Sequence, residues 1–170
     1  MRFVGRAWKL VDAEGRLIND IDTDQIYHNA YLAVKDINEM GRYALGNLEG
    51  YENFASEARQ GDIIIAGENF GSGSSRQQAV DCFTALGISC ILAKSFGVIY
   101  FRNAVNSALP VYRIKRIDLD RIKHLDVIEV DGTSVLLDGQ VVGELYPMSD
   151  IQESILKAGG LLEYAGSSGW

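Results

Sequence analysis

Two adjacent serines and an arginine, Ser74, Ser75 and Arg76, end the glycine-rich stretch that begins at residue 67. An arginine can hold a carboxylate through two parallel hydrogen bonds, and positive charge nearby favours a serine alkoxide. A serine in such a place could act as a base if its surroundings are dry and positively polarised. The structural alternative is that Ser74 or Ser75 only caps a helix while Arg76 packs along its surface.

The elements on either side of this stretch must position these three residues. An apolar run, 62–66, precedes it, and a segment with helical spacing of apolar residues, 77–86, follows it. A second apolar run, 88–93, completes a β-loop-α-β unit. The start of such a helix directs free N–H groups at the loop, which favours a bound carboxylate or phosphate. We therefore expect Gly71 and Gly73 to lie against a bound substrate.

Three common glycine-loop motifs do not fit this stretch. The dinucleotide-binding loop needs a third glycine where this chain has Arg76, and an acidic residue where it has Lys94. The phosphate-binding P-loop ends in Gly-Lys-Ser or Gly-Lys-Thr, which is missing here. The serine hydrolase motif Gly-x-Ser-x-Gly is broken by the spacing of Gly71, Ser72 and Gly73.

The whole stretch, GENFGSGSSR at 67–76, resembles the signature of the aconitase swivel domain. It is most similar to the version found in free-standing small subunits of isopropylmalate isomerase and homoaconitase. Further segments agree in order and spacing, namely 22–26 with 31–32, 93–104 and 158–164. The resemblance implies an α/β fold in three layers, β/β/α, a swivelling domain with a central βαβ core and a C-terminal β-hairpin region.

The resemblance also implies a function. Members of this family are subunits of heteromeric hydro-lyases that isomerise a 2-hydroxy di- or tricarboxylic acid by removing and re-adding water. By this likeness Ser74 abstracts the substrate proton, Ser75 lies beside it, and Arg76 binds a substrate carboxylate. Asp24 would organise the site from the opposite segment. The implied partners are the small anionic hydroxy acid and a large subunit that carries a [4Fe-4S] cluster.

Cysteine content agrees with a cluster on the partner. The chain has only Cys82 and Cys90, whereas a cubane cluster usually needs three or four thiolates. We expect both to be small buried residues of a reducing compartment, and neither His28 nor His124 has the spacing of a metal ligand. The sequence therefore predicts no cofactor and no metal bound by this chain itself.

Substrate choice is expected to depend on the segment Tyr31, Leu32, Ala33 and Val34. In the family, homoaconitase-like members tend to place an arginine just after Tyr-Leu, whereas isopropylmalate-type members place apolar residues. Apolar Ala33 and Val34 would favour a branched alkyl group and give a third carboxylate no charge partner. This favours the small subunit of 3-isopropylmalate dehydratase, an enzyme of leucine biosynthesis.

Several alternatives stay open at this point. Lys35 or Arg42 could supply the missing charge of a homoaconitase, and the segment could be an exposed loop without a selective role. His28, Gln77 and Val98 depart from the family pattern, which admits a dehydratase of another alkylmalate such as dimethylmalate or citramalate. Arg102 and Asn103 could brace the site. A non-catalytic regulatory module that binds anions would need Arg76 but no proton transfer by Ser74.

Composition sets the wider frame. The chain has 170 residues, 47% of them hydrophobic, which predicts one swivel domain over 1–164 and a mobile tail over 165–170. Sixteen basic against 23 acidic residues give a net charge of −7, which argues against nucleic acid or an anionic membrane as partner. Without an apolar signal segment or a run of membrane-spanning length, we expect a cytoplasmic protein.

The remaining pattern predicts the rest of the elements. We expect a first strand at 5–11, short helices within 36–45 and 51–58, a helix at 97–107 and a strand at 109–114. Asp-Gly pairs at 131–132 and 138–139 predict two hairpins. Ser149 and Gln152 form the pattern of a capping box before a last helix that Gly159 and Gly160 end.

Overall fold

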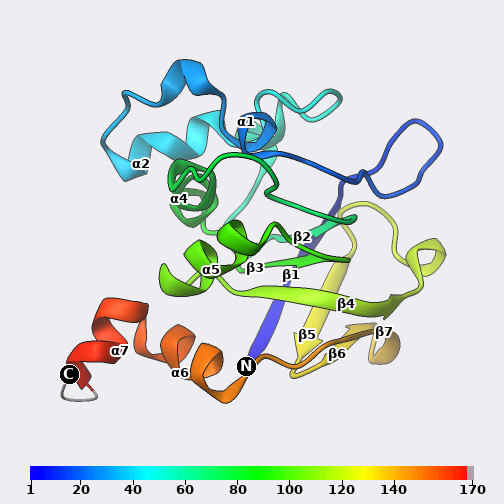
Figure 1. Cartoon of the computed structure of the whole chain (residues 1–170). Helices are drawn as coiled ribbons and strands as arrows, with labels where there is room; N and C mark the ends of the chain where they lie inside the picture. The colour runs from blue at the N-terminus through cyan, green and yellow to red at the C-terminus, as the bar shows by residue number, and fades with distance from the viewer. Residues whose placement is uncertain (168–170) are drawn as a thin grey trace.

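The computed structural model describes residues 1–167, which form a closed seven-stranded sheet with helices packed against one part of it (Figure 1). The strands are β1 Arg2–Lys9, β2 Ile63–Ala66, β3 Cys90–Ala93, β4 Val111–Ile117, β5 Val127–Asp131, β6 Ser134–Leu137 and β7 Gln140–Leu145. Their order around the sheet is β1-β2-β3-β4-β7-β6-β5. Strands β1 to β4 are parallel, and β5, β6 and β7 complete the closure by antiparallel pairing.

Most helices connect the parallel strands or follow the sheet. The α-helices are α1 Thr23–Ile26, α2 Ile37–Met40, α3 Phe54–Glu57, α4 Gln78–Leu86, α5 Val98–Asn106, α6 Asp150–Ala158 and α7 Leu161–Ser167. Three 3-10 helices are η1 Asn29–Tyr31, η2 Gly41–Tyr43 and η3 Leu119–Arg121. Figure 1 shows α1, α2, α4 and α5 on the side of the parallel strands, away from β5, β6 and β7.

Strand β2 explains why the fold has three layers. Successive side chains of a strand point to opposite faces. Ile63 and Ile65 belong to the core inside the closed sheet, whereas Ile64 and Ala66 belong to the core beneath the helices. All four are fully buried, as expected for a strand covered on both faces. The predicted β/β/α architecture is therefore confirmed, with the parallel strands as the middle layer.

The Asp-Gly hairpins are also found. Gly132 connects β5 to β6 with φ of 59°, and Asp138 and Gly139 connect β6 to β7 with φ of 51° and 78°. At the second turn two residues have the positive φ whose twist matches that of the strands, whereas at the first turn Gly132 alone has it. These turns let three short strands follow one another and close the sheet against β1.

Some boundaries differ from the prediction. Strand β1 begins at Arg2, earlier than predicted, because its first residues pair with β5, with Arg2 opposite Asp131. The capping box of Ser149 and Gln152 is present. The predicted tail begins inside α7, since this helix continues to Ser167, and the rest of that tail, residues 168–170, lies outside the described residues. The domain boundary at residue 164 stays a prediction.

Candidate functional site

The loop between β2 and α4 carries the serines and the arginine, and its backbone is fastened on two sides. Phe70 donates its N–H to the Ser95 carbonyl at 3.0 Å and accepts from Gly97 at 2.9 Å. On the other side, Gly71 donates to the Ile21 carbonyl at 2.7 Å. The segments before α1 and α5 therefore hold the loop between them.

Gly71 has no room for a side chain. Its φ is 81°, and an added Cβ would lie 2.2 Å from Cγ of Tyr100. Tyr100 is buried, and its hydroxyl donates to the Ala79 carbonyl at 2.8 Å, so the ring is itself fixed. The chain needs glycine here so that the loop can approach α5.

Helix α1 forms hydrogen bonds with the loop at residues 72 and 74. Thr23, which begins α1, donates its N–H to the Ser72 carbonyl and its hydroxyl to the Ser74 carbonyl, both at 2.9 Å. The helix is itself fixed by a capping box in which Asp22 and Gln25 bond to each other's backbone N–H. A short helix of one turn therefore determines where the loop residues lie.

Five of the predicted site residues meet in one small pocket: Gly71, Gly73, Ser74, Ser75 and Arg76. Its volume is about 10 Å³, room for no more than one water molecule. Ser74 and Ser75 are exposed at its mouth. The pocket of the described residues is thus open to solvent, and another surface would be needed to enclose a substrate there.

Four other residues line the same pocket: Thr23, Ile99, Tyr100 and Asn103. Thr23, Ile99 and Tyr100 were not predicted from the sequence to be site residues. Ile99 and Asn103 are four residues apart in α5 and so share one helix face, which is the signal that could have found them. Asn103 donates to Oγ of Ser75 at 3.3 Å, whereas Arg102 is exposed, so only Asn103 of the predicted bracing pair contacts a site serine.

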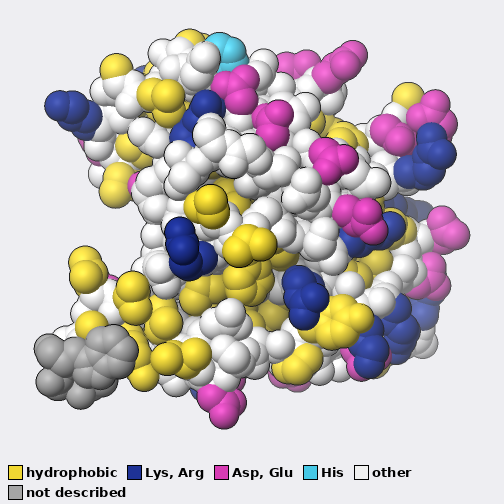
Figure 2. Space-filling model, viewed as in Figure 1, with side chains coloured by type: hydrophobic (Ala, Val, Ile, Leu, Met, Phe, Trp, Pro, Cys, Tyr) yellow, Lys and Arg dark blue, Asp and Glu magenta, His cyan; other side chains and the backbone are white. Residues whose placement is uncertain are grey.

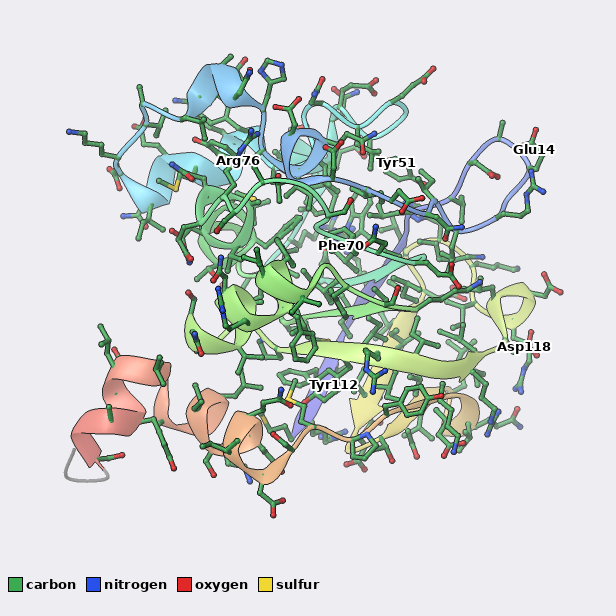
Figure 3. The ribbon with its side chains drawn as sticks, in the orientation of Figure 1. Glu14, Tyr51, Phe70, Arg76, Tyr112 and Asp118 are labelled. Atoms are coloured by element: carbon green, nitrogen blue, oxygen red, sulfur yellow. The ribbon has the colours of Figure 1, made fainter. Side chains whose placement is uncertain are left out.

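Arg76, which is labelled in Figure 3, is held in place by two hydrogen bonds. Its Nη1 donates to Oδ1 of Asp24 and to the carbonyl of Tyr27, both at 2.9 Å. The Arg76 side chain is only 14% exposed. Both bonds use Nη1, so the edge formed by Nε and Nη2 retains the paired geometry that suits a carboxylate. Asp24 therefore orients the arginine, whereas its role in a substrate site stays a prediction.

The electrostatics of Asp24 follow from this contact. The hydrogen bond from Arg76 holds the pKa of the Asp24 carboxyl below its ordinary value, and a further bond from the backbone N–H of Asn29 acts the same way. Asn47 donates to the other carboxylate oxygen at 3.1 Å. An ionised Asp24 thus keeps the Arg76 side chain in the orientation seen here.

The structure corrects the expected relation between the serines and the helix. Helix α4 begins at Gln78, with Gln77 at its N-cap, so Ser74 and Ser75 precede the helix and cap nothing. The helix dipole acts mainly within the first turn, which reduces its expected help to a Ser74 alkoxide. Gln77, a departure from the family pattern, donates to Ser107 at 2.7 Å and to Asp81 at 3.1 Å and so links α4 to the residue after α5.

The expected specificity segment does not line this pocket. Tyr31 stacks on Tyr43, with ring centroids 3.9 Å apart, and lines a neighbouring pocket with His28 and Arg42. Leu32 and Ala33 are exposed, and Val34 packs against the core. The carbonyl of Leu32 accepts a long bond of 3.5 Å from Gln78, which ties the segment to the start of α4. Substrate contact by Tyr31, Leu32, Ala33 and Val34 stays a prediction.

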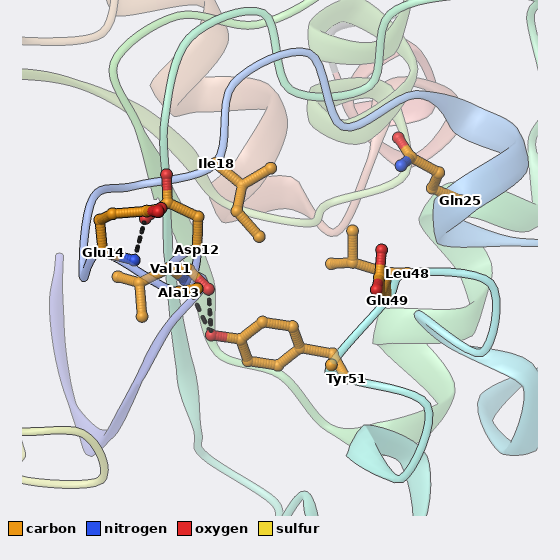
Figure 4. A pocket seen from close by; sticks show the side chains of 10 residues that line it. Val11, Asp12, Ala13, Glu14, Ile18, Gln25, Leu48, Glu49 and Tyr51 are labelled. Atoms are coloured by element: carbon orange, nitrogen blue, oxygen red, sulfur yellow. Dashed lines mark hydrogen bonds between the residues drawn. The ribbon is translucent and has the colours of Figure 1, made fainter.

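A wider groove of about 710 Å³ lies on another part of the surface (Figure 4). Val11, Ile18, Leu48 and Tyr51 supply its apolar lining. The Tyr51 hydroxyl accepts from the Val11 N–H and donates to the Lys9 carbonyl, each at 2.8 Å. The tyrosine therefore fixes the turn after β1, and the groove contains none of the serines or arginines of the loop motif.

The residues of this chain do not fit an iron–sulfur cluster. Within residues 1–167, no three His, Cys, Asp or Glu side chains gather in a way that could hold a metal ion. Both thiols are buried, and burial raises the pKa of Cys90 to about 12 and that of Cys82 further still. Cluster ligands are thiolates, so neither cysteine is suited to the task.

No helix within residues 1–167 is both long and apolar enough to cross a membrane. The exposed hydrophobic side chains lie instead as scattered groups. Val98 at the start of α5 is 85% exposed, and Leu162 in α7 is 83% exposed. Figure 2 shows hydrophobic side chains on the face that carries α5 and α6.

Comparison with known proteins agrees with this fold. A model of the aconitase C-terminal domain family matches residues 16–116. The 3-isopropylmalate dehydratase small subunit 1 of Archaeoglobus fulgidus is 40% identical over 167 residues, which cover 96% of this chain and 97% of that protein. The 3-isopropylmalate dehydratase small subunit of Aquifex aeolicus is also 40% identical, over 97% of this chain and 95% of that protein.

A solved structure agrees as well. The crystal structure of 3-isopropylmalate dehydratase (leuD) from Methanocaldococcus jannaschii superposes with a TM-score of 0.85 at 34% identity, over 99% of this chain and 96% of that one. The three-layer fold and the Ser-Ser-Arg loop define a swivel domain of the aconitase type. The chain belongs to the aconitase C-terminal domain family and, within it, to the group of 3-isopropylmalate dehydratase small subunits.

Proposed function

We propose that this chain is the small subunit of a 3-isopropylmalate dehydratase and supplies the proton-transfer half of its active site. The observation that supports this most directly is the meeting of Ser74, Ser75 and Arg76 at one open pocket. The chain also aligns over nearly its whole length with small subunits of that enzyme. It is a hydro-lyase subunit that acts on a 2-hydroxy dicarboxylic acid.

The reaction requires two opposite steps. In the first, a C–H bond beside a carboxylate and the C–O bond of the hydroxyl group break, a C=C bond forms, and water leaves. In the second, water adds across the same double bond with the hydroxyl group on the other carbon. The [4Fe-4S] cluster expected on the large subunit would supply the Lewis acid for the hydroxyl group that leaves or returns.

The residues of this chain act on the C–H bond, from which the proton is removed. Ser74 takes the proton from the carbon as an alkoxide and becomes a hydroxyl group. In the second step it gives the proton to the carbon that lost the hydroxyl group, while hydroxide adds to the carbon that lost its proton, and the alkoxide is regenerated. Removing this proton places negative charge on the adjacent carboxylate, and Arg76 stabilises that charge through Nε and Nη2. Asp24 holds Nη1 of Arg76 and so keeps this edge free for substrate.

The open pocket accounts for the need of a large subunit. A pocket with room for one water molecule is too small to enclose the substrate and exclude water from its carbanion. A second protein must therefore cover Ser74 and Ser75. Ile99, which is 43% exposed at the pocket, and the neighbouring Val98 give the covering protein or the substrate an apolar surface. Such a partner would bring its cluster to the exposed serines.

The proposed substrate class follows from the small number of cationic groups among the residues that line the described pocket. Arg76 is its one basic residue, and Ile99 is its exposed apolar one. This combination favours an alkyl-substituted dicarboxylic acid over a tricarboxylic acid. A homoaconitase would need Lys35, Arg42 or the partner to bind the third carboxylate, and another alkylmalate would differ only in the alkyl group. The cytoplasmic location and the lack of nucleic acid and membrane partners stay predictions.

Turnover by the reconstituted complex tests this proposal. The chain is mixed anaerobically with a candidate cluster-bearing large subunit, and isopropylmalate, homoaconitate, citraconate and dimethylmalate are compared by kcat/KM. We expect isopropylmalate to be preferred and the isolated chain to be colourless and inactive. Preference for the tricarboxylate would assign the protein to the homoaconitases. Binding of anions without turnover of any substrate would instead support a regulatory module.

A further inference from the structure

We infer that Thr23 is a positioning residue that determines where Ser74 lies in the site, an inference that rests on the proposed function. Thr23 is only 3% exposed, so its side chain is almost entirely shielded from bulk water. Its hydroxyl donates to the Ser74 carbonyl at 2.9 Å, and its N–H donates to the Ser72 carbonyl at 2.9 Å. One residue therefore holds the loop on both sides of Gly73.

The loop needs such a restraint because its own backbone restricts the position of Ser74 very little. Gly73 has a φ of 94°, a region where glycine moves freely and other residues rarely enter. Ser74 and Ser75 are exposed and lie in no helix or strand. Without the bonds to Thr23, this part of the loop would have many backbone conformations open to it.

Thr23 can impose a position because α1 is itself fixed. The capping box of Asp22 and Gln25 closes its first turn, and Ile26 at its end is fully buried in the core beneath the helices. The next residue, Asp24, binds Arg76. Two consecutive residues of α1 thus hold the base and the cation of the site, and the helix sets the spacing between them.

The chemistry explains why this spacing matters. A general base must lie within about 2.6–3.2 Å of the atom whose proton it removes. A displacement of about 1 Å costs on the order of 100-fold in rate. Thr23 lies behind the loop and acts through the Ser74 backbone, so its loss should reduce proton transfer much more than it reduces substrate binding.

Three variants in the full chain separate this role from general stability. Thr23→Val keeps the shape but removes the hydroxyl group, and Thr23→Ser restores it. Ser89→Ala is the matched control, because the Ser89 hydroxyl also donates to a backbone carbonyl at 2.9 Å, that of Gly61, away from the loop. Each variant is assayed in the reconstituted complex and, as the isolated chain, by hydrogen exchange of the loop amides.

We expect Thr23→Val to lower kcat by roughly 10- to 100-fold with KM within about threefold. With a substrate deuterated at the carbon that loses its proton, the kinetic isotope effect on kcat/KM should be larger for Thr23→Val than for the parent. The amides of residue 23 and Ser72, which are hydrogen-bonded in the parent, should exchange at least about tenfold faster in Thr23→Val. Thr23→Ser should remain near the parent, and Ser89→Ala should match the parent in kcat and loop exchange.

Thr23→Val with unchanged kcat, isotope effect and loop exchange would overturn the inference. So would equal effects of Thr23→Val and Thr23→Ser, because the hydroxyl group would then not matter. If the parent complex turns over no hydroxy acid, the proposed function fails instead. Loop exchange in the isolated chain would still decide whether Thr23 holds the loop.

Discussion

Replacing Gly71 by alanine should damage both the fold and the site, by an amount that the structure allows us to estimate. Alanine at a φ of 81° costs about 1–2 kcal/mol from backbone strain. The new Cβ would lie 2.2 Å from Cγ of Tyr100, and forcing an atom into a packed core adds about 1–3 kcal/mol. We expect Gly71→Ala to lower the free energy of unfolding by about 2–5 kcal/mol.

Gly139→Ala provides the matched control for this prediction. Gly139 has nearly the same φ, 78°, but no atom lies within 4 Å of the Cβ that alanine would add. It should therefore lose only the strain, about 1–2 kcal/mol. Urea denaturation of the isolated chains measures both values, and turnover in the complex measures the effect on the site.

The difference between the two variants isolates the contact with Tyr100. Gly71→Ala should also reduce turnover much more than Gly139→Ala, because the altered residue lies three positions before Ser74. Equal destabilisation of the two variants would refute the reasoning, since it would mean that the loop does not pack against Tyr100. Full turnover by Gly71→Ala would refute the link between this contact and the site.

Two further predictions concern the stability of the fold and its thiols. Burial would raise the pKa of Asp62, but hydrogen bonds from Arg6, the Arg59 N–H and Trp8 outweigh it and hold the pKa below its ordinary value. The stabilisation is therefore present above the unfolded pKa of about 3.9 and is lost as pH falls through the folded value. Asp62→Asn should cost roughly 1.5–3 kcal/mol at pH 7 in urea denaturation, a gap that should narrow below about pH 4; a gap that stays constant down to pH 3 would contradict this. Cys82 and Cys90 should react with a thiol reagent at pH 8 only after unfolding, and rapid labelling of the folded chain would show that they are not buried as described.

Much of the fold could be predicted because local patterns agree with the final packing. The isoleucines of β2 predicted a strand buried on both faces, and the structure divides them between two cores. The Asp-Gly pair at 138–139 predicted a tight turn, and both residues have the positive φ that this turn requires. In such places one or two residues carry the signal, and no distant contact is needed to interpret it.

The details of the site depended on distant contacts and were harder to predict. The sequence left open whether Ser74 or Ser75 caps α4, and the structure shows that the cap position belongs to Gln77 while α1 and the residues before α5 hold the loop. The roles of Thr23 and Asn103 arise from hydrogen bonds to residues 51 and 28 positions away. No local pattern encodes such pairs, so only the folded chain reveals them.

The specificity segment shows the same limit. Apolar Ala33 and Val34 suggested a surface for an alkyl group, yet Val34 packs against the core and Ile99 is the apolar side chain at the pocket. Periodicity identifies which residues of α5 share a face but not which pocket that face meets. That relation is set by the parallel order of β2, β3 and β4.

The assignment of Ser74 as the base is tested by initial rates of isopropylmalate turnover by the complex, with the parent chain and with Ser74→Ala. We expect Ser74→Ala to lower kcat by orders of magnitude while subunit association stays nearly unchanged. Ser75→Ala serves as the comparison, because Ser75 lies beside the base without taking the proton. Turnover by Ser74→Ala equal to that of the parent complex would contradict the assignment of Ser74 as the base.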